Sequence, residues 1–132
     1  MIKLDIRTRN RQEFVDVTER VQRAVTDSGF ESGVVTCFVP HTTAAVTINE
    51  HADPDVVTDM ISALSTVFPE RGDYRHVEGN SDAHIKSSLI GCSVQVLVEQ
   101  GRLVLGRWQG IFFCEFDGPR SRTLIVKVAR DA

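Results

Sequence analysis

The sequence predicts an α+β domain with a mainly antiparallel β-sheet, and three observations carry that prediction. Strand-like and helix-like segments follow one another in the order strand, helix, strands, helices, strands, which is typical of this class. Several segments alternate apolar and polar residues with the two-residue period of a half-buried strand. The chain has 132 residues, 42% of them hydrophobic and 25% charged. We therefore expect one globular domain over residues 1–132.

The N-terminal segment predicts a strand, a short partner strand and a helix. Residues 2–8, IKLDIRT, alternate apolar and polar side chains, and residues 14–15 follow a polar turn as the partner strand. Asp16 or Thr18 is suited to cap the helix, because its side chain accepts hydrogen bonds from free backbone N–H groups. The apolar stripe of this helix consists of Val17, Val21, Ala24 and Val25, and Gly29 ends the helix.

The middle of the chain predicts two strands and a longer helix. Residues 33–40, GVVTCFVP, form a buried strand that stops at a proline, and residues 43–49, TAAVTIN, form the next strand. Asp53 followed by Pro54 is a strong signal for the start of a helix. The Asp53 carboxylate can cap the first turn, and Pro54 lacks only a backbone N–H that has no partner within the helix at that position. Pro69 ends this helix. The apolar residues of the helix recur with a 3.6-residue period: Val56, Val57, Met60, Ile61, Leu64, Val67 and Phe68.

A short helix is predicted after the polar stretch of residues 70–80. Ser81 is expected to cap it, and Ile85 and Leu89 are expected to form its core-facing stripe. Positions four apart stack on one helix face, so His84 should point away from the core.

The rest of the chain predicts two antiparallel strand pairs. Residues 92–106 should form a hairpin that turns at Gly101, and residues 110–118 should pair with residues 122–129 around the Gly118–Pro119 turn. Alternation in the first of these strands places Phe112, Cys114 and Phe116 on one face. Ile111, Phe113, Glu115 and Asp117 occupy the other face, which becomes acidic toward Gly118.

Composition argues against several classes of partner. Fifteen basic against 18 acidic side chains give a net charge of −3, so no basic face is expected for a nucleic acid or an anionic membrane. No stretch approaches the roughly 20 apolar residues that span a bilayer, and no secretory leader is expected. Three dispersed cysteines, Cys37, Cys92 and Cys114, suggest neither a disulfide framework nor a thiolate zinc site. A cytoplasmic protein is expected.

Three of the four histidines lie in polar stretches: His41, His76 and His84. Three imidazoles with one open position suit a catalytic divalent metal, with zinc first and manganese or nickel as alternatives. The spacing matches no local metal motif, because a strand end, a loop and a helix would have to converge. For each histidine taken alone, the sequence favours a surface or capping side chain over a metal ligand.

The first turn of the short helix offers a second kind of site. Its free N–H groups and positive dipole end suit an anion such as phosphate, whereas Asp82 argues against one unless a metal or an arginine intervenes. In the alternative interpretation, Ser81 and Asp82 only cap the helix, a contribution of about 1 kcal/mol.

A second polar cluster occupies residues 105–122, LGRWQGIFFCEFDGPRSR. Arginines in this rim could bind phosphate and carboxylates could bind a cation. The candidate ligand- and cofactor-binding side chains are Arg107, Gln109 and Arg120. Turn glycines and a surface tryptophan explain much of the same pattern without a ligand.

Three strings carry a family resemblance: HTTAAVTINEHADPDV, HVEGNSDAHIKSSLIG and LGRWQGIFFCEFDGPRSR. They closely resemble the signature segments of the YjbQ-like family, also called the secondary thiamine-phosphate synthase enzyme family. The resemblance implies two packed, mainly antiparallel sheets with helices, assembled as a homotrimer, and a metal-binding pocket completed at a subunit boundary. His51 stands where the family pattern has asparagine, and we interpret it as a loop residue.

The resemblance also assigns residues and an activity. His41 matches the family's H-T-T, His76 and Glu78 its H-x-E-G-N, and Asp82 and His84 its D-A-H. Glu50 matches N-E. The family name implies a weak thiamine-phosphate synthase activity, in which a hydroxymethylpyrimidine diphosphate and a thiazole phosphate give thiamine phosphate and pyrophosphate. The primary role is not implied by that name.

Two main functions follow from these observations. In the first, the protein is a metal-dependent enzyme whose three histidines hold zinc, or else magnesium or manganese, and whose substrate is a small phosphorylated molecule. Glu50, Glu78 or Asp82 then serves as base or orients a ligand. In the second, the same residues form a non-catalytic binding trimer. A purely structural metal would need a fourth protein ligand, which the sequence does not identify.

Overall fold

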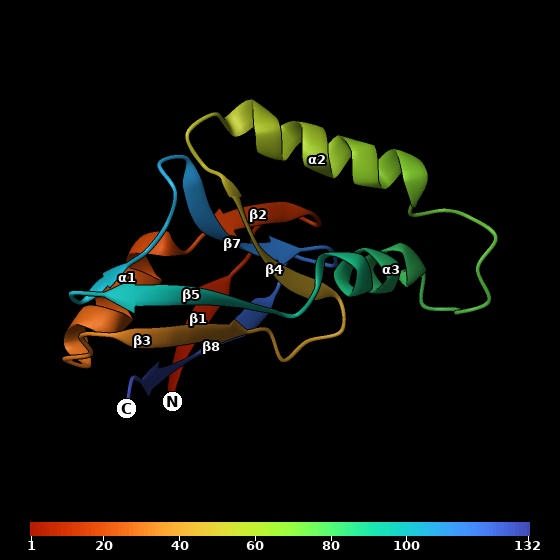
Figure 1. Ribbon diagram of the computed structural model, residues 1–132. Helices are drawn as coiled ribbons and strands as arrows, with labels where there is room; N and C mark the ends of the chain where they lie inside the picture. The colour runs from red at the N-terminus through yellow and green to blue at the C-terminus, as the bar shows by residue number, and fades with distance from the viewer.

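The computed structural model describes all 132 residues and has two antiparallel sheets with three helices (Figure 1). The five-stranded sheet has the order β1-β8-β3-β5-β6, and the three-stranded sheet has the order β2-β7-β4. The predicted α+β class with two antiparallel sheets is confirmed. The strands are β1 (Ile2–Arg7), β2 (Glu13–Asp16), β3 (Gly33–Phe38), β4 (Ala44–Glu50), β5 (Ser93–Glu99), β6 (Arg102–Leu103), β7 (Gln109–Glu115) and β8 (Ser121–Arg130), and the helices are α1 (Thr18–Asp27), α2 (Pro54–Val67) and α3 (Ser81–Ile90).

Strand β7 is buried on both faces, and its alternation divides the core in two. Ile111 and Phe113 belong to the main core shared with the five-stranded sheet and α1. Phe112 and Cys114 belong to a smaller core on the other face, which includes Ala83 of α3. The predicted alternation of this strand, with Phe112 and Cys114 on one face and Ile111 and Phe113 on the other, is therefore confirmed, because successive side chains point to opposite sides.

The C-terminal end of α1 and the start of α2 follow the predicted signals. α1 ends just before Gly29, whose φ is +69°. Its N-cap residue is Val17 and no side chain caps it, so the expected cap by Asp16 or Thr18 is wrong; the Asp16 carboxylate instead accepts hydrogen bonds from the backbone N–H and hydroxyl of Thr18, the first residue of the helix. The Asp53 carboxylate accepts from the N–H of Asp55 at 2.9 Å, with proline as the first residue of α2. No side chain of α2 is fully buried, although its apolar residues keep a helical period. None of the three helices is long and apolar enough to cross a membrane.

Both expected strand pairs at the ends of the chain are wrong in their partners. β2 pairs with β7 rather than with β1, and β8 pairs with β1 and β3 rather than with β7. The chain passes from one sheet to the other at both turns. The two crossings lie side by side, since the Gly118 N–H donates to the carbonyl of Arg11 at 2.9 Å. A Cβ at Gly118 would stand 2.3 Å from the Asn10 carbonyl oxygen, so glycine permits the close approach.

The predicted core-facing stripe of α3, Ile85 and Leu89, is also wrong, whereas His84 lies off the buried face of the helix as expected. Its buried side chains are Asp82, Ala83, Lys86 and Ser87, whereas Leu89 is 61% exposed. Asn80, not Ser81, precedes the helix as its N-cap residue, and no side chain caps it. The physical reason is the surface beneath α3, where Arg11 and Gln12 supply polar partners for a polar helix face. Apolar periodicity alone could not anticipate those partners.

Candidate functional site

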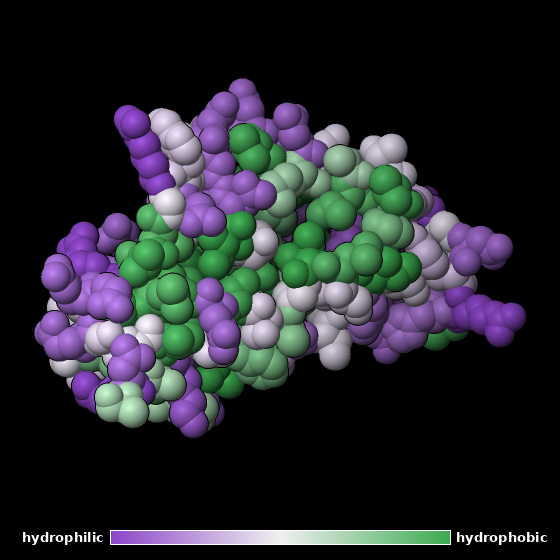
Figure 2. All heavy atoms as spheres, viewed as in Figure 1, coloured by the Kyte–Doolittle hydropathy of each residue, from purple (hydrophilic) through white to green (hydrophobic).

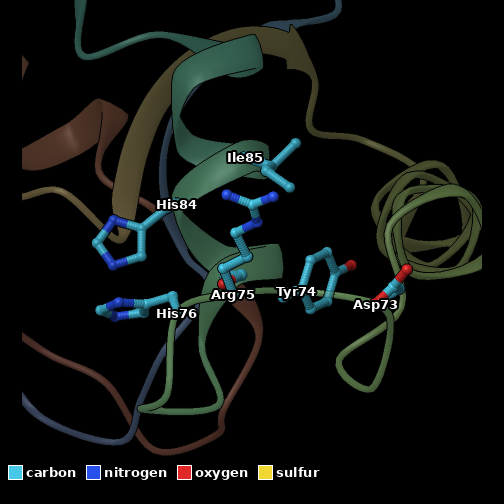
Figure 3. A pocket seen from close by; sticks show the side chains of 7 residues that line it. Asp73, Tyr74, Arg75, His76, His84 and Ile85 are labelled. Carbon is cyan, nitrogen blue, oxygen red and sulfur yellow. The ribbon is translucent and has the colours of Figure 1, made fainter.

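Two adjacent cavities share His84 as a lining residue. The first has a volume of about 440 Å³ and lies between α3 and the loop that precedes it (Figure 3). The second, of about 470 Å³, lies where α3 meets the start of β4. Asp73, Tyr74, Arg75, His76, Ser81, His84 and Ile85 line the first cavity. His41, Thr42, Ala44, His84, Ser87, Ser88, Gly91 and Cys92 line the second.

The rings of His76 and His84 lie next to each other in the lining of the first cavity. Their rings are 5.4 Å apart between centroids and nearly perpendicular, at 87° (Figure 3). His84 comes from the partly exposed side of α3, and His76 comes from the loop. Glu78 stands beside this pair, with a carboxylate oxygen 3.6 Å from Nε2 of His76. The loop thus places an imidazole and a carboxylate next to a helix-borne imidazole.

His41 belongs to the second cavity and is held by the backbone of β8. The N–H of Thr123 donates to its Nε2 at 2.9 Å. The ring also packs edge-on against Phe113, with centroids 6.5 Å apart. Burial, and then the positive charge of Arg122, lower the pKa of His41 below its ordinary value. The ring is therefore neutral at neutral pH.

Asp82 lines neither cavity, because its side chain is fully buried on the inner face of α3. Arg11 donates two hydrogen bonds to its carboxylate, at 3.0 and 3.2 Å, and Nζ of Lys86 donates a third at 2.8 Å. Burial opposes ionisation, yet the bonds from Arg11 and Lys86 lower the pKa of Asp82 overall. Lys86 also donates to Gln12 at 3.0 Å. These contacts make Asp82 a residue that anchors α3, so His84 is presented from a fixed helix.

The sequence interpretation missed Arg11 and Lys86 as partners of this carboxylate. A local signal exists for Lys86, which follows Asp82 by four residues and therefore shares its helix face. No local signal exists for Arg11, which is 71 residues away.

A second buried ion pair, also missed, supports the His41 side. Glu115 and Arg122 are both buried, and Arg122 donates to the Glu115 carboxylate through Nε and Nη2. Nη2 of Arg122 also donates to the hydroxyl of Thr43 at 2.9 Å and to its carbonyl at 3.2 Å. Burial opposes ionisation of Glu115, but the bonds from Arg122 and Thr8 lower its pKa overall. The predicted acidic face of β7 is thus an internal ion pair.

Several predicted site residues lie far from both cavities. Glu50 is paired with Gln109 at the opposite end of the three-stranded sheet from Ala44. Six residue steps along β4 separate these ends by about 20 Å. Arg107 stacks over the exposed ring of Trp108, 4.9 Å from its centroid, instead of lining a cavity.

Arg120 lies at the cavity end of the sheet but is tied to Asp117. It donates to the carboxylate and the backbone carbonyl of that residue, at 3.1 and 2.9 Å. Asp117 also accepts from the Asn80 side chain at 2.9 Å. Arg120 is thereby connected to the start of α3, and it lines neither of the two cavities.

The three predicted metal ligands are not assembled as one group within the chain. No cluster of three or more His, Cys, Asp or Glu side chains is positioned to hold a metal ion. His76 and His84 form a close pair, and the donor types fit zinc. His41 does not fit as a third ligand here, since its Nε2 already accepts a backbone hydrogen bond.

Comparison with known proteins places the chain in one family. The model of the UPF0047 protein YjbQ-like family matches residues 2–131. A UPF0047 protein of Methanocaldococcus jannaschii is 50% identical, over 99% of this chain and 95% of its own length. The UPF0047 protein YugU of Bacillus subtilis is 51% identical over 95% and 96%. An uncharacterised protein of the yjbq/upf0047 family from Clostridium acetobutylicum has a solved structure with a TM-score of 0.96 and 53% identity, covering 98% of this chain and 100% of its own. The chain belongs to the YjbQ-like UPF0047 family.

Proposed function

We propose that the protein is an enzyme that acts on a small phosphorylated molecule bound across the two cavities. One observation carries this proposal: His84 lines both cavities, with His76 beside it in the first and His41 in the second. A molecule that occupies both cavities must pass His84. Imidazoles that line adjoining concave surfaces are typical of sites where protons or metal ions are handled.

The first cavity is the better place for the phosphate group. It lies at the N-terminal half of α3, where free backbone N–H groups and the helix dipole favour negative charge. Arg75 and His76 add donors to its lining. Asp82, which argued against an anion here, is neutralised by Arg11 and Lys86 beneath the helix.

A divalent metal, with zinc first and magnesium or manganese as alternatives, is the cofactor in this proposal. His76 and His84 would hold it, with Glu78 adjacent. When bound, the metal would neutralise charge on the phosphate oxygens. The chain's own contribution is orientation: the buried contacts of Asp82 fix α3, and the loop sets His76 against it.

Thiamine-phosphate synthesis with release of pyrophosphate is the candidate reaction, and it rests on the family resemblance alone. Binding without turnover is the alternative. The three cysteines are free, as befits a reducing compartment, and we place the enzyme in the cytoplasm.

The proposed assembly is a homotrimer, and the surface of α2 supports it. Apolar side chains gather over α2 and the adjoining end of α3 (Figure 2). They line an open hollow formed by Met60, Ala63, Leu64, Val67, Phe68 and Ile90. Exposed apolar surface of this kind marks interfaces. A neighbouring subunit would also bring Glu50, Arg107 and Gln109, which lie away from the cavities of their own chain, to a shared site. Sedimentation should give the trimer mass, and Leu64→Glu should give a monomer; a wild-type monomer would contradict the trimer.

The test of function compares His84→Ala with His51→Ala. Pyrophosphate release from the pyrimidine diphosphate and thiazole phosphate pair should fall about 10- to 100-fold in the first variant. The second variant should match the wild type, because His51 pairs with Asp16 far from both cavities. Equal rates in all three proteins would reject catalysis at this site. Binding of the two substrates to wild type without pyrophosphate release would favour the non-catalytic alternative.

A further inference from the structure

We propose that His41 is not a metal ligand but a hydrogen-bond donor, which presents its Nδ1–H to a neutral acceptor atom of the molecule bound in the second cavity. This inference deepens the proposed function and rests on it, since it takes the second cavity as part of the binding site. It separates the three histidines into a pair at the first cavity and a single donor at the second.

The hydrogen bond from Thr123 decides the state of the ring. A nitrogen that accepts an N–H bond carries no proton, so a neutral His41 carries its proton on Nδ1. A metal ion needs an unprotonated ring nitrogen. Nε2 has its lone pair engaged and Nδ1 has its proton, so neither nitrogen is available. Nδ1 makes no hydrogen bond within the chain, and it is not a buried polar atom that lacks a partner. Its proton is therefore free to be donated into the cavity that His41 lines.

The ion pair of Glu115 and Arg122 holds this arrangement together. Arg122 binds both the hydroxyl and the carbonyl of Thr43, two residues after His41, and it directly precedes Thr123, the donor to Nε2. One buried guanidinium therefore fixes the segment that carries the ring and the segment that carries its donor. Its positive charge also disfavours a second proton on His41. Arg122 is a positioning residue for His41.

The polarity of α3 separates the chemistry of the two cavities. Ser87, Ser88 and Gly91 of the second cavity lie at the C-terminal end of α3, where the dipole disfavours an anion. The partner of Nδ1–H is therefore a neutral acceptor such as a carbonyl oxygen or an unprotonated ring nitrogen. The substrate class is a small molecule with a phosphate at one end and a neutral acceptor group at the other, spanning His84.

Nitrogen NMR of the full-length protein tests the ring state directly. Long-range ¹H–¹⁵N correlations, measured with and without zinc, should show His41 protonated on Nδ1 in both samples, while His76 and His84 shift on zinc addition. An Nε2-protonated His41, or a His41 nitrogen that shifts to a metal-bound position, would overturn the inference.

Zinc affinity gives a second readout. His41→Gln should leave it unchanged, because the glutamine carbonyl still accepts from Thr123, whereas His76→Ala should weaken it by at least about tenfold. Equal weakening in both variants would overturn the inference. If the wild type binds no zinc, the metal in the proposed function is rejected, and the ring state of His41 is still decided by NMR.

The positioning role of Arg122 has its own measurement. Arg122→Lys should yield a mixture of the two ring tautomers of His41 in a folded protein. Thr43→Val, which removes only the hydroxyl that accepts from Arg122, provides the milder variant if the lysine substitution prevents folding. An unchanged single tautomer in the folded variants would contradict the positioning role.

Discussion

Helices α1 and α3 have ten residues each, and they are held to the domain by different forces. α1 buries Val21, Ala24 and Val25 against the main core, so apolar surface removed from water stabilises it. The only other side chains that α3 buries beside Asp82 and Lys86 are the small ones of Ala83 and Ser87, so the helix depends on a closed network of charged hydrogen bonds.

The difference teaches how a site-bearing helix can be fixed in place. Apolar packing is not directional, whereas the hydrogen bonds from Arg11 to Asp82 and from Lys86 to Gln12 join α3 to the segment beneath it and so set the rotation and position of the helix. The rotation of α3 decides that His84 lies between the two cavities. α1 carries no residue of the site and needs no such restraint.

The largest expected effect comes from removing the acceptor of the α3 network. Asp82→Ala leaves Arg11 and Lys86 without their shared counter-charge, and the free energy of unfolding should fall by about 3–5 kcal/mol. Urea denaturation followed by circular dichroism measures it. The matched control is Asp27→Ala at the exposed end of α1, where a change below about 0.5 kcal/mol is expected. Similar losses at both positions would erase the contrast between the helices.

A smaller loss is expected from the apolar face of α1. Val25→Ala removes two methyl groups from a side chain with no exposed surface, and unfolding free energy should fall by about 1.5–3 kcal/mol. Val77→Ala, at a loop position that is 94% exposed, is the control and should be nearly neutral. If Val25→Ala were as harmless as Val77→Ala, apolar burial would not be what holds α1.

A double variant can make the buried face of α3 apolar, as the buried face of α1 already is. The double variant Asp82→Leu with Lys86→Met replaces the charges together and leaves Arg11 its contact with Glu70, at 3.2 Å. Its stability should lie within about 1 kcal/mol of wild type, because a buried pair exchanged for apolar residues costs little. The double variant should nevertheless lose the His84-dependent rate, since the directional restraint is gone. A double variant as unstable as Asp82→Ala would contradict this account.

The smallest expected effect on stability comes from the exposed apolar residue of α3. Leu89→Ala should change the unfolding free energy by less than about 0.5 kcal/mol, because this side chain is mostly exposed. A core-facing leucine would cost about 2–5 kcal/mol on the same substitution. A loss in that range would restore the orientation of α3 expected from apolar spacing.

Local signals predicted most elements of the fold. The Asp53–Pro54 start of α2, the Gly29 end of α1 and the alternation of β7 all depend on residues within one or two turns of each other, so they can be read along the chain. Strand partners cannot be read in this way. β8 could equally have folded back on β7, and only the shared core with β1 and β3 determines that it does not.

The candidate site likewise combines features that local sequence predicts with contacts that only the tertiary structure determines. The sequence by itself determined the α+β class, the family and the residue types that the site draws on, because these depend on composition, periodicity and local motifs. Only the tertiary structure decided that His76 and His84 form a pair, that Thr123 occupies Nε2 of His41, and that Arg11 closes on Asp82. Each of these contacts joins elements from different parts of the fold, and His41 and Thr123 are 82 residues apart. Such contacts exist only once both sheets and α3 have packed, which is why no local pattern encodes them.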